Sequence, residues 1–162
     1  MSGKLFRPEQ ARLIAATFAR HGVEYLFIGK GGAILLGYPG ATQDVDVFPR
    51  KSEKNGRKIV AALVELGFPL TGAEQEDIVQ GKVFVQIGSG PFDVDLVFAP
   101  DGIESYDAAA RNAENVDGFP VMSIRDIIAS KRAAGRKRDL AELELLESFR
   151  EVYEALKSRK ES

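Results

Sequence analysis

The chain has 162 residues, the size of one ordinary domain, and a chain of this length buries a core without disulfide or metal staples. It contains no cysteine and one histidine, which excludes disulfides, thiolate metal sites, a cysteine nucleophile and a His-rich metal site. Because 22 Lys and Arg residues oppose 24 Asp and Glu residues, the net charge of −2 indicates neither a nucleic-acid nor a membrane partner.

The first part of the chain predicts two helices and two strands. An amphipathic helix begins at Pro8 and is ended by a glycine at position 22. The apolar run 23–28 predicts a strand, and a glycine-rich turn over 29–32 connects it to a short buried helix over 33–36. Residues 43–48 alternate polar and apolar side chains with a period of two, which is typical of a strand.

The middle of the chain predicts a long helix followed by a hairpin. Ser52 can cap a helix that runs to about residue 66. Strands over 82–87 and 92–98 are joined by the turn 88–91 as an antiparallel hairpin. A short helix over about 104–112 follows them.

The last part of the chain predicts a small hairpin and two helices. The hairpin turns at Asp117 and Gly118, and Ser123 opens a helix that ends near residue 133. The final helix covers about 138–157. These elements predict an α/β (α+β) fold, with a mixed β-sheet flanked by helices and a C-terminal helical pair.

We expect these elements to form a single domain over residues 1–162, with a core over about 8–121 and the C-terminal helices over about 123–158. The sequence has no recognisable targeting signal, and no apolar stretch reaches the roughly 18 residues of a membrane span. We therefore expect no membrane partner and a cytoplasmic protein.

Two aspartates in a predicted strand are the most informative residues. Asp44 and Asp46 stand at i and i+2, so both carboxylates project from one face, about 6–7 Å apart along the chain. A bound cation relieves the repulsion between such charges, and oxygen ligands without His or Cys suit Mg²⁺ or Mn²⁺. The alternative is a half-exposed strand whose outer face is acidic.

A second pair, Asp93 and Asp95, lies on a later predicted strand. If the two strands are neighbours, one of these carboxylates completes a three-carboxylate site. Three acidic groups can hold two divalent ions in the arrangement that suits in-line displacement at phosphorus.

Two further segments have the chemistry to bind phosphate. The glycines in the turn 29–32 let backbone N–H groups approach phosphate oxygens. Residues 125–138 carry six Lys or Arg side chains against one Asp, a local charge of +5. This basic run either binds phosphates or is a solvated helix face whose basic end suits the helix dipole.

The run from Tyr25 to Val47 combines these features in one order: a strand, a glycine turn, a short helix and a strand bearing Asp-x-Asp. This order resembles the signature of the DNA polymerase β-like nucleotidyltransferase superfamily. The stretch 121–140 looks like small bacterial members of that group, among them the abortive-infection type toxin nucleotidyltransferases, which carry a similar Lys…Arg-x-x-Asp-Leu helix pair. The likeness spans roughly residues 23–146.

The resemblance implies a nucleotidyltransferase fold and a metal-dependent enzyme. Such an enzyme uses Mg²⁺ or Mn²⁺ to move an NMP from an NTP substrate to an acceptor hydroxyl on RNA, protein or a small molecule. A role as the toxin of a toxin–antitoxin pair, with an antitoxin partner, is part of the same expectation. Catalysis and metal binding fall to Asp44, Asp46 and Asp95. Nucleotide binding falls to Gly29, Lys30, Gly31, Thr42, Lys131, Arg136 and Asp139.

Two positions depart from the family's pattern. Lys30 stands where the family's turn has a second Gly or a Ser, and a lysine there either reaches a triphosphate or obstructs one. Gly40 stands where many relatives carry a basic residue. Two alternatives therefore stay open: a catalytically weakened nucleotide-binding or regulatory module with the same fold, and an interaction domain whose acidic strands are surface. No sequence-specific reading of DNA or RNA is indicated, because aromatic residues are not interleaved with the basic run.

Overall fold

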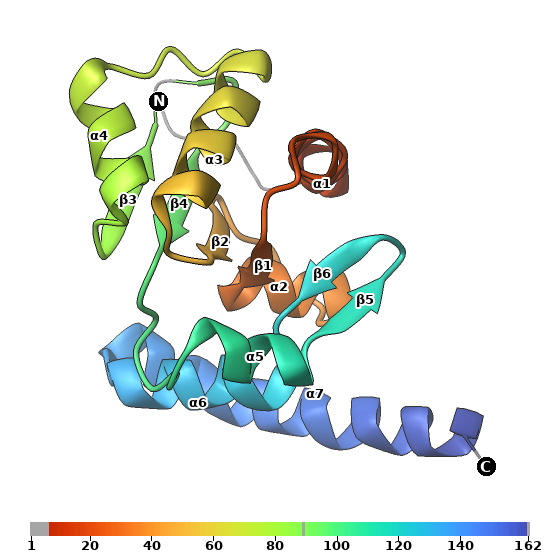
Figure 1. Ribbon diagram of the computed structural model, residues 1–162. Coiled ribbons are helices and arrows are strands. Elements are labelled where there is room, and N and C mark those ends of the chain that lie inside the picture. The colour runs from red at the N-terminus through yellow and green to blue at the C-terminus, as the bar shows by residue number, and fades with distance from the viewer. Residues whose placement is uncertain (1–6, 89, 162) are drawn as a thin grey trace.

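A computed structural model describes residues 7–88 and 90–161 of the chain (Figure 1). In this part of the chain, six strands form one sheet in the order β3-β4-β2-β1-β6-β5. The strands are β1 (Tyr25–Ile28), β2 (Val45–Pro49), β3 (Phe84–Ile87), β4 (Val94–Val97), β5 (Glu114–Val116) and β6 (Phe119–Val121). The sheet is mixed, because β1 pairs antiparallel with β2 and parallel with β6, while β2 pairs parallel with β4.

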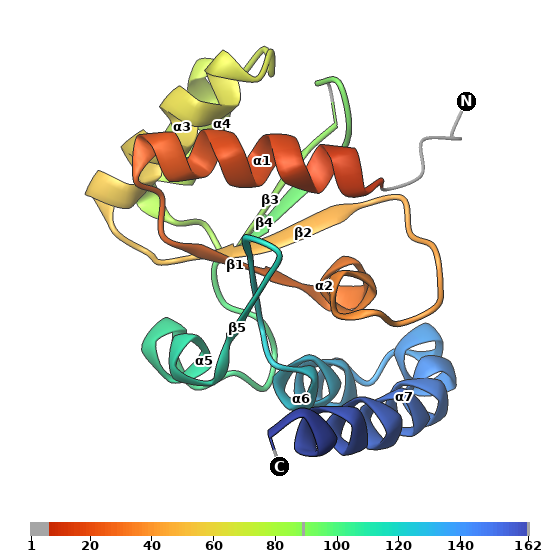
Figure 2. The ribbon, with the colours of Figure 1, turned by 90° about the vertical axis from the view of Figure 1, so that its right-hand side faces the viewer.

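Helices cover both faces of this sheet. They are α1 (Pro8–His21), α2 (Gly29–Leu36), α3 (Glu53–Glu65), α4 (Gly72–Gln80), α5 (Tyr106–Asn112), α6 (Ile124–Ala134) and α7 (Lys137–Glu161). Figure 2 shows α1, α3 and α4 on one side of the sheet and α2, α6 and α7 on the other. The mixed sheet, the flanking helices and the C-terminal helical pair confirm the predicted fold class.

The alternation of side chains in β2 and β4 separates the core from the polar face. Val45, Val47, Val94 and Leu96 are at most 1% exposed, and each buried side chain of this kind stabilises the fold by about 1.5–3 kcal/mol. The intervening residue on each strand is an aspartate that projects from the opposite face. The same pattern that builds the core therefore directs these carboxylates to one side of the sheet.

The glycine-rich segment is not the connecting turn that the sequence predicts. Gly29 is already the first residue of α2, so the helix begins directly after β1. The reason is close packing: a Cβ on Gly32 would lie 3.1 Å from the Phe27 carbonyl oxygen and 3.4 Å from the Ile127 side chain. Glycine lets this helix lie against β1 and α6 despite its low helix propensity.

Helix α4 is absent from the sequence prediction. Thr71 accepts a hydrogen bond from the Glu74 N–H at 3.1 Å, and the Glu74 carboxylate accepts one from the Thr71 N–H at 2.8 Å. The helix packs on α3 at Gly56, where a Cβ would come within 2.7 Å of the Val79 Cα. This α3–α4 pair supports the edge of the sheet formed by β3 and β4.

The other predicted elements lie close to their expected bounds. The final helix is longer than predicted at both ends, and α6 is capped as expected, with the Asp126 N–H donating to Ser123 Oγ at 3.1 Å. The predicted turn 88–91 includes Ser89, which lies outside the described residues. None of the helices described is both long and apolar enough to span a bilayer.

Candidate active site

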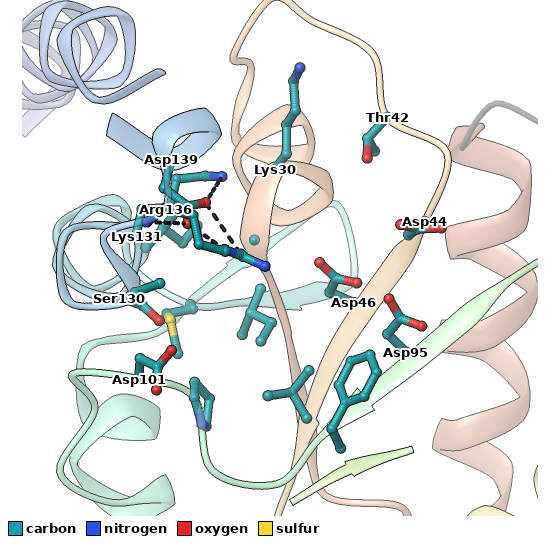
Figure 3. Close-up of a pocket in the computed structure, with 18 of the residues that line it drawn as sticks. Lys30, Thr42, Asp44, Asp46, Asp95, Asp101, Ser130, Lys131, Arg136 and Asp139 are labelled. Carbon is teal, nitrogen blue, oxygen red and sulfur yellow. Dashed lines mark hydrogen bonds and ion pairs between the residues drawn. The ribbon is translucent and has the colours of Figure 1, made fainter. Parts of the chain in front are cut away.

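A pocket of about 530 Å³ lies where the ends of β1 and β2 meet β4, α2, α6 and α7 (Figure 3). It is lined by three aspartates of the strand region, by the first residues of α2 and by the turn between α6 and α7. The predicted site residues in its wall are Gly29, Lys30, Thr42, Asp44, Asp46, Asp95, Lys131, Arg136 and Asp139. Gly31 is buried within α2 and does not line the pocket.

Strand register brings two carboxylates side by side. In the parallel pairing of β2 and β4, Asp46 is the direct partner of Asp95, so both side chains project from the same face. Asp44 precedes β2 by one residue and is half-buried. Figure 3 shows Asp46 and Asp95 next to each other, with Asp44 on the segment that leads into β2. The two strands are therefore neighbours, the condition that the sequence prediction left open.

Burial and mutual repulsion make this pair hard to ionise fully. Burial, reinforced by the charges of Asp46 and Asp44, raises the pKa of Asp95 to about 7. Burial likewise raises the pKa of Asp46 to about 6, although the hydrogen bond with Asp95 and the nearby Lys131 and Arg136 oppose the shift. Such a hydrogen bond requires one of the two groups to be protonated, so in the absence of a cation the pair retains a proton near neutral pH.

Gly29 makes room for the Asp46 carboxylate. Its φ is +66°, a left-handed conformation that glycine adopts readily. A Cβ at this position would lie 2.7 Å from Asp46 Oδ2. The start of α2 and the carboxylate thus approach as closely as they do only because residue 29 has no side chain.

The opposite wall of the pocket is cationic and is organised by a buried acid. Asp139 is 1% exposed and accepts a hydrogen bond from Arg136 Nε at 2.6 Å, and its Oδ1 lies 3.5 Å from Lys131 Nζ. Burial alone would raise the pKa of Asp139, but the hydrogen bonds from Arg136 and the charges of Arg136 and Lys131 lower it. Figure 3 shows the Arg136 guanidinium directed toward Asp46. Asp139 therefore positions two cations that face the carboxylates.

Lys30 neither crosses the pocket nor obstructs the aspartates. Its Nζ lies 3.4 Å from Glu142 Oε2 on α7, and the Tyr38 hydroxyl donates to the same oxygen at 3.2 Å. Figure 3 shows Lys30 extending away from Asp46. The residue that departs from the family's pattern is thus held at the rim of the pocket, between α2 and α7.

The donor atoms at the carboxylates fit a hard divalent cation. Asp95 Oδ1 is buried and accepts no hydrogen bond from any residue of the described chain, which leaves a polar atom that needs a positive partner. All the candidate ligands are carboxylate oxygens, as Mg²⁺ and Mn²⁺ prefer. Within residues 7–88 and 90–161, however, no three acidic or histidine side chains are grouped closely enough to hold a metal as they stand. Cation binding would therefore require the carboxylates to turn together.

Several pocket residues were not predicted from the sequence. They are polar or charged residues of α6, α7 and the segment after β4, together with apolar residues of β3 and β4. The main ones are Val83, Phe84, Val97, Pro100, Asp101, Ser130 and Glu142. Their contribution depends on long-range packing, and no local pattern in the sequence marks them.

Comparisons with known proteins concern the fold. The chain matches no protein-family model, and no curated protein matches it. Among solved structures it resembles a candidate nucleotidyltransferase from Thermotoga maritima, with a TM-score of 0.48 and 17% sequence identity. The alignment covers 94% of this chain and 97% of the other.

Proposed function

We propose that this protein is a metal-dependent nucleotidyltransferase that transfers an NMP from an NTP to an acceptor hydroxyl. The observation that carries the proposal is the opposition of two charged walls across one pocket. Asp46 and Asp95 lie side by side on neighbouring strands, and Arg136 and Lys131 face them from α6 and the turn before α7. Displacement at phosphorus requires carboxylates that bind metal cations and cationic side chains that bind phosphates.

In this proposal the cationic wall binds the triphosphate. Lys131 and Arg136 neutralise its β- and γ-phosphates, and Asp139 holds both side chains in place. The first turn of α2 adds backbone N–H groups at the positive end of a helix dipole. Thr42, at the approach to β2, completes the nucleotide-binding residues in the pocket wall.

In the same proposal, the carboxylates bind the metal and accept the proton of the acceptor. Asp44, Asp46 and Asp95 would hold Mg²⁺ or Mn²⁺, which when bound neutralises phosphate charge and polarises the α-phosphorus. Asp95 accepts the proton of the acceptor hydroxyl. The hydroxyl oxygen bonds to the α-phosphorus, the bond from that phosphorus to the bridging oxygen of the β-phosphate breaks, and pyrophosphate leaves.

One observation favours a second candidate, a catalytically weakened nucleotide-binding or regulatory module with the same fold. The carboxylates of the described chain are not grouped for metal binding as they stand, and Lys30 is engaged with Glu142. In such a module the cationic wall binds NTP while the carboxylates transfer nothing.

Label transfer distinguishes the two. The protein is incubated with Mg²⁺, α-labelled NTP, and in separate reactions total RNA, total protein or a small-molecule extract. An enzyme transfers the α-label to a discrete acceptor, and γ-labelled NTP labels nothing because the γ-phosphate leaves with pyrophosphate. A toxin role would require that acceptor to be a cellular RNA or protein.

Asp46→Asn serves as the inactive control, with Asp77→Asn as the matched variant of an aspartate outside the pocket wall. Label that arrives from the γ position would refute nucleotidyl transfer. NTP binding without transfer to any acceptor would favour the regulatory module.

A further inference from the structure

Beside the carboxylates, the pocket continues onto an apolar surface formed by β3, β4 and the residues that adjoin them. This apolar shelf consists of Phe84, Val97, Ala99 and Pro100, all of which line the same cavity. Phe84 is 47% exposed. Single exposed apolar residues are ordinary, but a phenylalanine grouped with three other apolar lining residues at the edge of a charged pocket indicates a surface that a ligand covers.

Strand register places the Phe84 ring on the face that carries the carboxylates. Phe84 is the direct partner of Val97 in the antiparallel pairing of β3 and β4, and Gln86 is the direct partner of Asp95. Direct partners project from the same face of a sheet, so Phe84 lies diagonally across from Asp95, about 6–7 Å along the strand. The shelf and the proposed proton acceptor are therefore neighbours.

The two ends of the pocket differ in charge. Its cationic lining residues belong to α2, α6, the turn between α6 and α7, and the start of α7, and neither β3 nor β4 supplies one: the four are Lys30, Lys131, Arg136 and Arg138. In the sheet, β1 and β4 lie on opposite sides of β2, and β3 is the edge strand beyond β4. Helix α2 begins directly after β1. The lysine that precedes β3, Lys82, pairs with Asp77 at 3.7 Å and is not part of the pocket wall.

We propose that the apolar shelf binds the acceptor, and that the acceptor is a small molecule without negative charge that has an aromatic ring and a hydroxyl group. The inference rests on the proposed function, in which the triphosphate occupies the cationic wall and the acceptor approaches from the Asp95 side. Aromatic stacking on Phe84 positions the ring, and the hydroxyl lies toward Asp95. A polyanion such as an RNA end is disfavoured, because the charges beside the shelf are carboxylates.

Binding to the shelf can be measured without the reaction. The probe is 4-nitrophenyl β-D-glucopyranoside, an uncharged aryl compound with hydroxyl groups, and methyl β-D-glucopyranoside is the same sugar without the ring. Methyl-labelled protein reports the contact through the NMR signals of Val97 and Ala99. We expect the aryl glucoside alone to shift both signals to saturation, and Phe84→Ala to weaken its binding roughly tenfold.

Two variants act as controls. Phe84→Tyr keeps the ring and should keep the binding, which separates loss of stacking from loss of folding. Leu145→Ala removes a side chain of similar exposure, 61%, on α7 outside the pocket wall and should change nothing.

Three results would overturn the inference. The first is the absence of any saturable shift with the aryl probe, and the second is a larger shift of the same signals by an RNA tetranucleotide. The third is a loss of Mg–NTP affinity in Phe84→Ala, which would assign the shelf to the nucleobase. The proposed function is judged separately, by stabilisation of the wild type with Mg–NTP and by label transfer, and both can succeed while the shelf binds no acceptor.

Discussion

The carboxylate strands and the cationic wall face each other across one pocket but are held in opposite ways. Asp46 and Asp95 are brought together by backbone register, and Asp95 Oδ1 accepts no hydrogen bond from the described chain. Lys131 and Arg136 are fixed by side-chain contacts with Asp139, which neutralises much of their charge.

This difference indicates which wall of the pocket gains more free energy when a ligand binds. In the empty pocket the pair is hard to ionise, and a bound cation relieves the repulsion between the two charges, so binding energy is available at the carboxylates. Lys131 and Arg136 are already paired with Asp139, so they are oriented before a ligand binds. The cationic wall therefore contributes more through this preorganisation than through new electrostatic attraction. Four changes break or sharpen this contrast.

The largest expected effect is on transfer at the carboxylates. Asp46→Asn removes the charge that faces both the proposed cation and the cationic wall, while the strand and its buried valines remain. We expect label transfer to fall by about 10²–10³-fold, as for loss of one preorganised group at the reacting atoms. Initial rates with α-labelled NTP measure the loss, and circular dichroism checks that the fold is intact. Transfer within a few-fold of wild type would remove Asp46 from the chemistry.

The next largest effect is on stability at the cationic wall. Asp139→Ala leaves Lys131 and Arg136 without their buried partner and removes the acceptor for the Arg136 backbone N–H at the start of α7. We expect the free energy of unfolding to fall by about 2–3 kcal/mol. Urea unfolding measures it, with Glu144→Ala on the exposed side of the same helix as the control. Equal stability of the two variants would contradict the role given to Asp139.

A third test uses pH. The pKa of Asp95 is raised from its ordinary 3.8 to about 7 in the fold, so the folded state keeps a proton that the unfolded state has already lost. When no metal is bound, the stability from this proton is complete below about pH 4 and is lost as the pH rises through about 7.

Asp95→Asn should flatten this dependence, because Asn carries no charge at either pH. Urea unfolding at about pH 4, 6 and 8 in the presence of a chelator gives the slope for both proteins. Millimolar Mg²⁺ should flatten the wild-type curve as well. A variant that retains the wild-type slope would mean that other groups cause it.

The smallest expected effect is at the rim of the pocket, where Lys30 pairs with Glu142. Glu142→Gln frees Lys30 from a partly exposed ion pair, which changes stability by no more than about 1 kcal/mol. The released ammonium can then reach a triphosphate, so NTP affinity should rise by a few-fold, whereas Lys30→Gly should lower the affinity of both proteins to the same level. Titration with tripolyphosphate and orthophosphate measures the preference. Tighter binding in Lys30→Gly would mean that the lysine obstructs the site.

The sequence predicted the individual carboxylates but not that Asp46 and Asp95 lie side by side. A period of two shows which side chains share a face of a strand, so the pairs Asp44/Asp46 and Asp93/Asp95 could be recognised, and the family resemblance selected Asp95 from the second pair. Their adjacency depends on the parallel pairing of β2 with β4 across α3, α4 and β3, and no local pattern encodes that choice. Two strands that are far apart in sequence become neighbours only through packing.

Other features were missed for identifiable reasons. The Thr71-x-x-Glu74 box marks the start of α4, yet only Ile78 of that helix is buried, so apolar periodicity was too weak to support it. The glycines of α2 suggest a turn by propensity, and tertiary contact with β1 overrides that preference. Asp139 was assigned to nucleotide binding by resemblance, whereas its burial beneath Arg136 and Lys131 could be seen only in three dimensions.

The close approach of Gly29 to Asp46 also constrains how the protein can evolve. Every replacement at this position adds a Cβ into a space 2.7 Å from a carboxylate oxygen and must adopt a φ of +66°. Gly72 has a negative φ and no neighbouring atom within 4 Å of its Cβ position. In a saturation library selected for function, codon 29 should remain almost invariant while codon 72 drifts freely, although both encode the same residue at the first position of a helix.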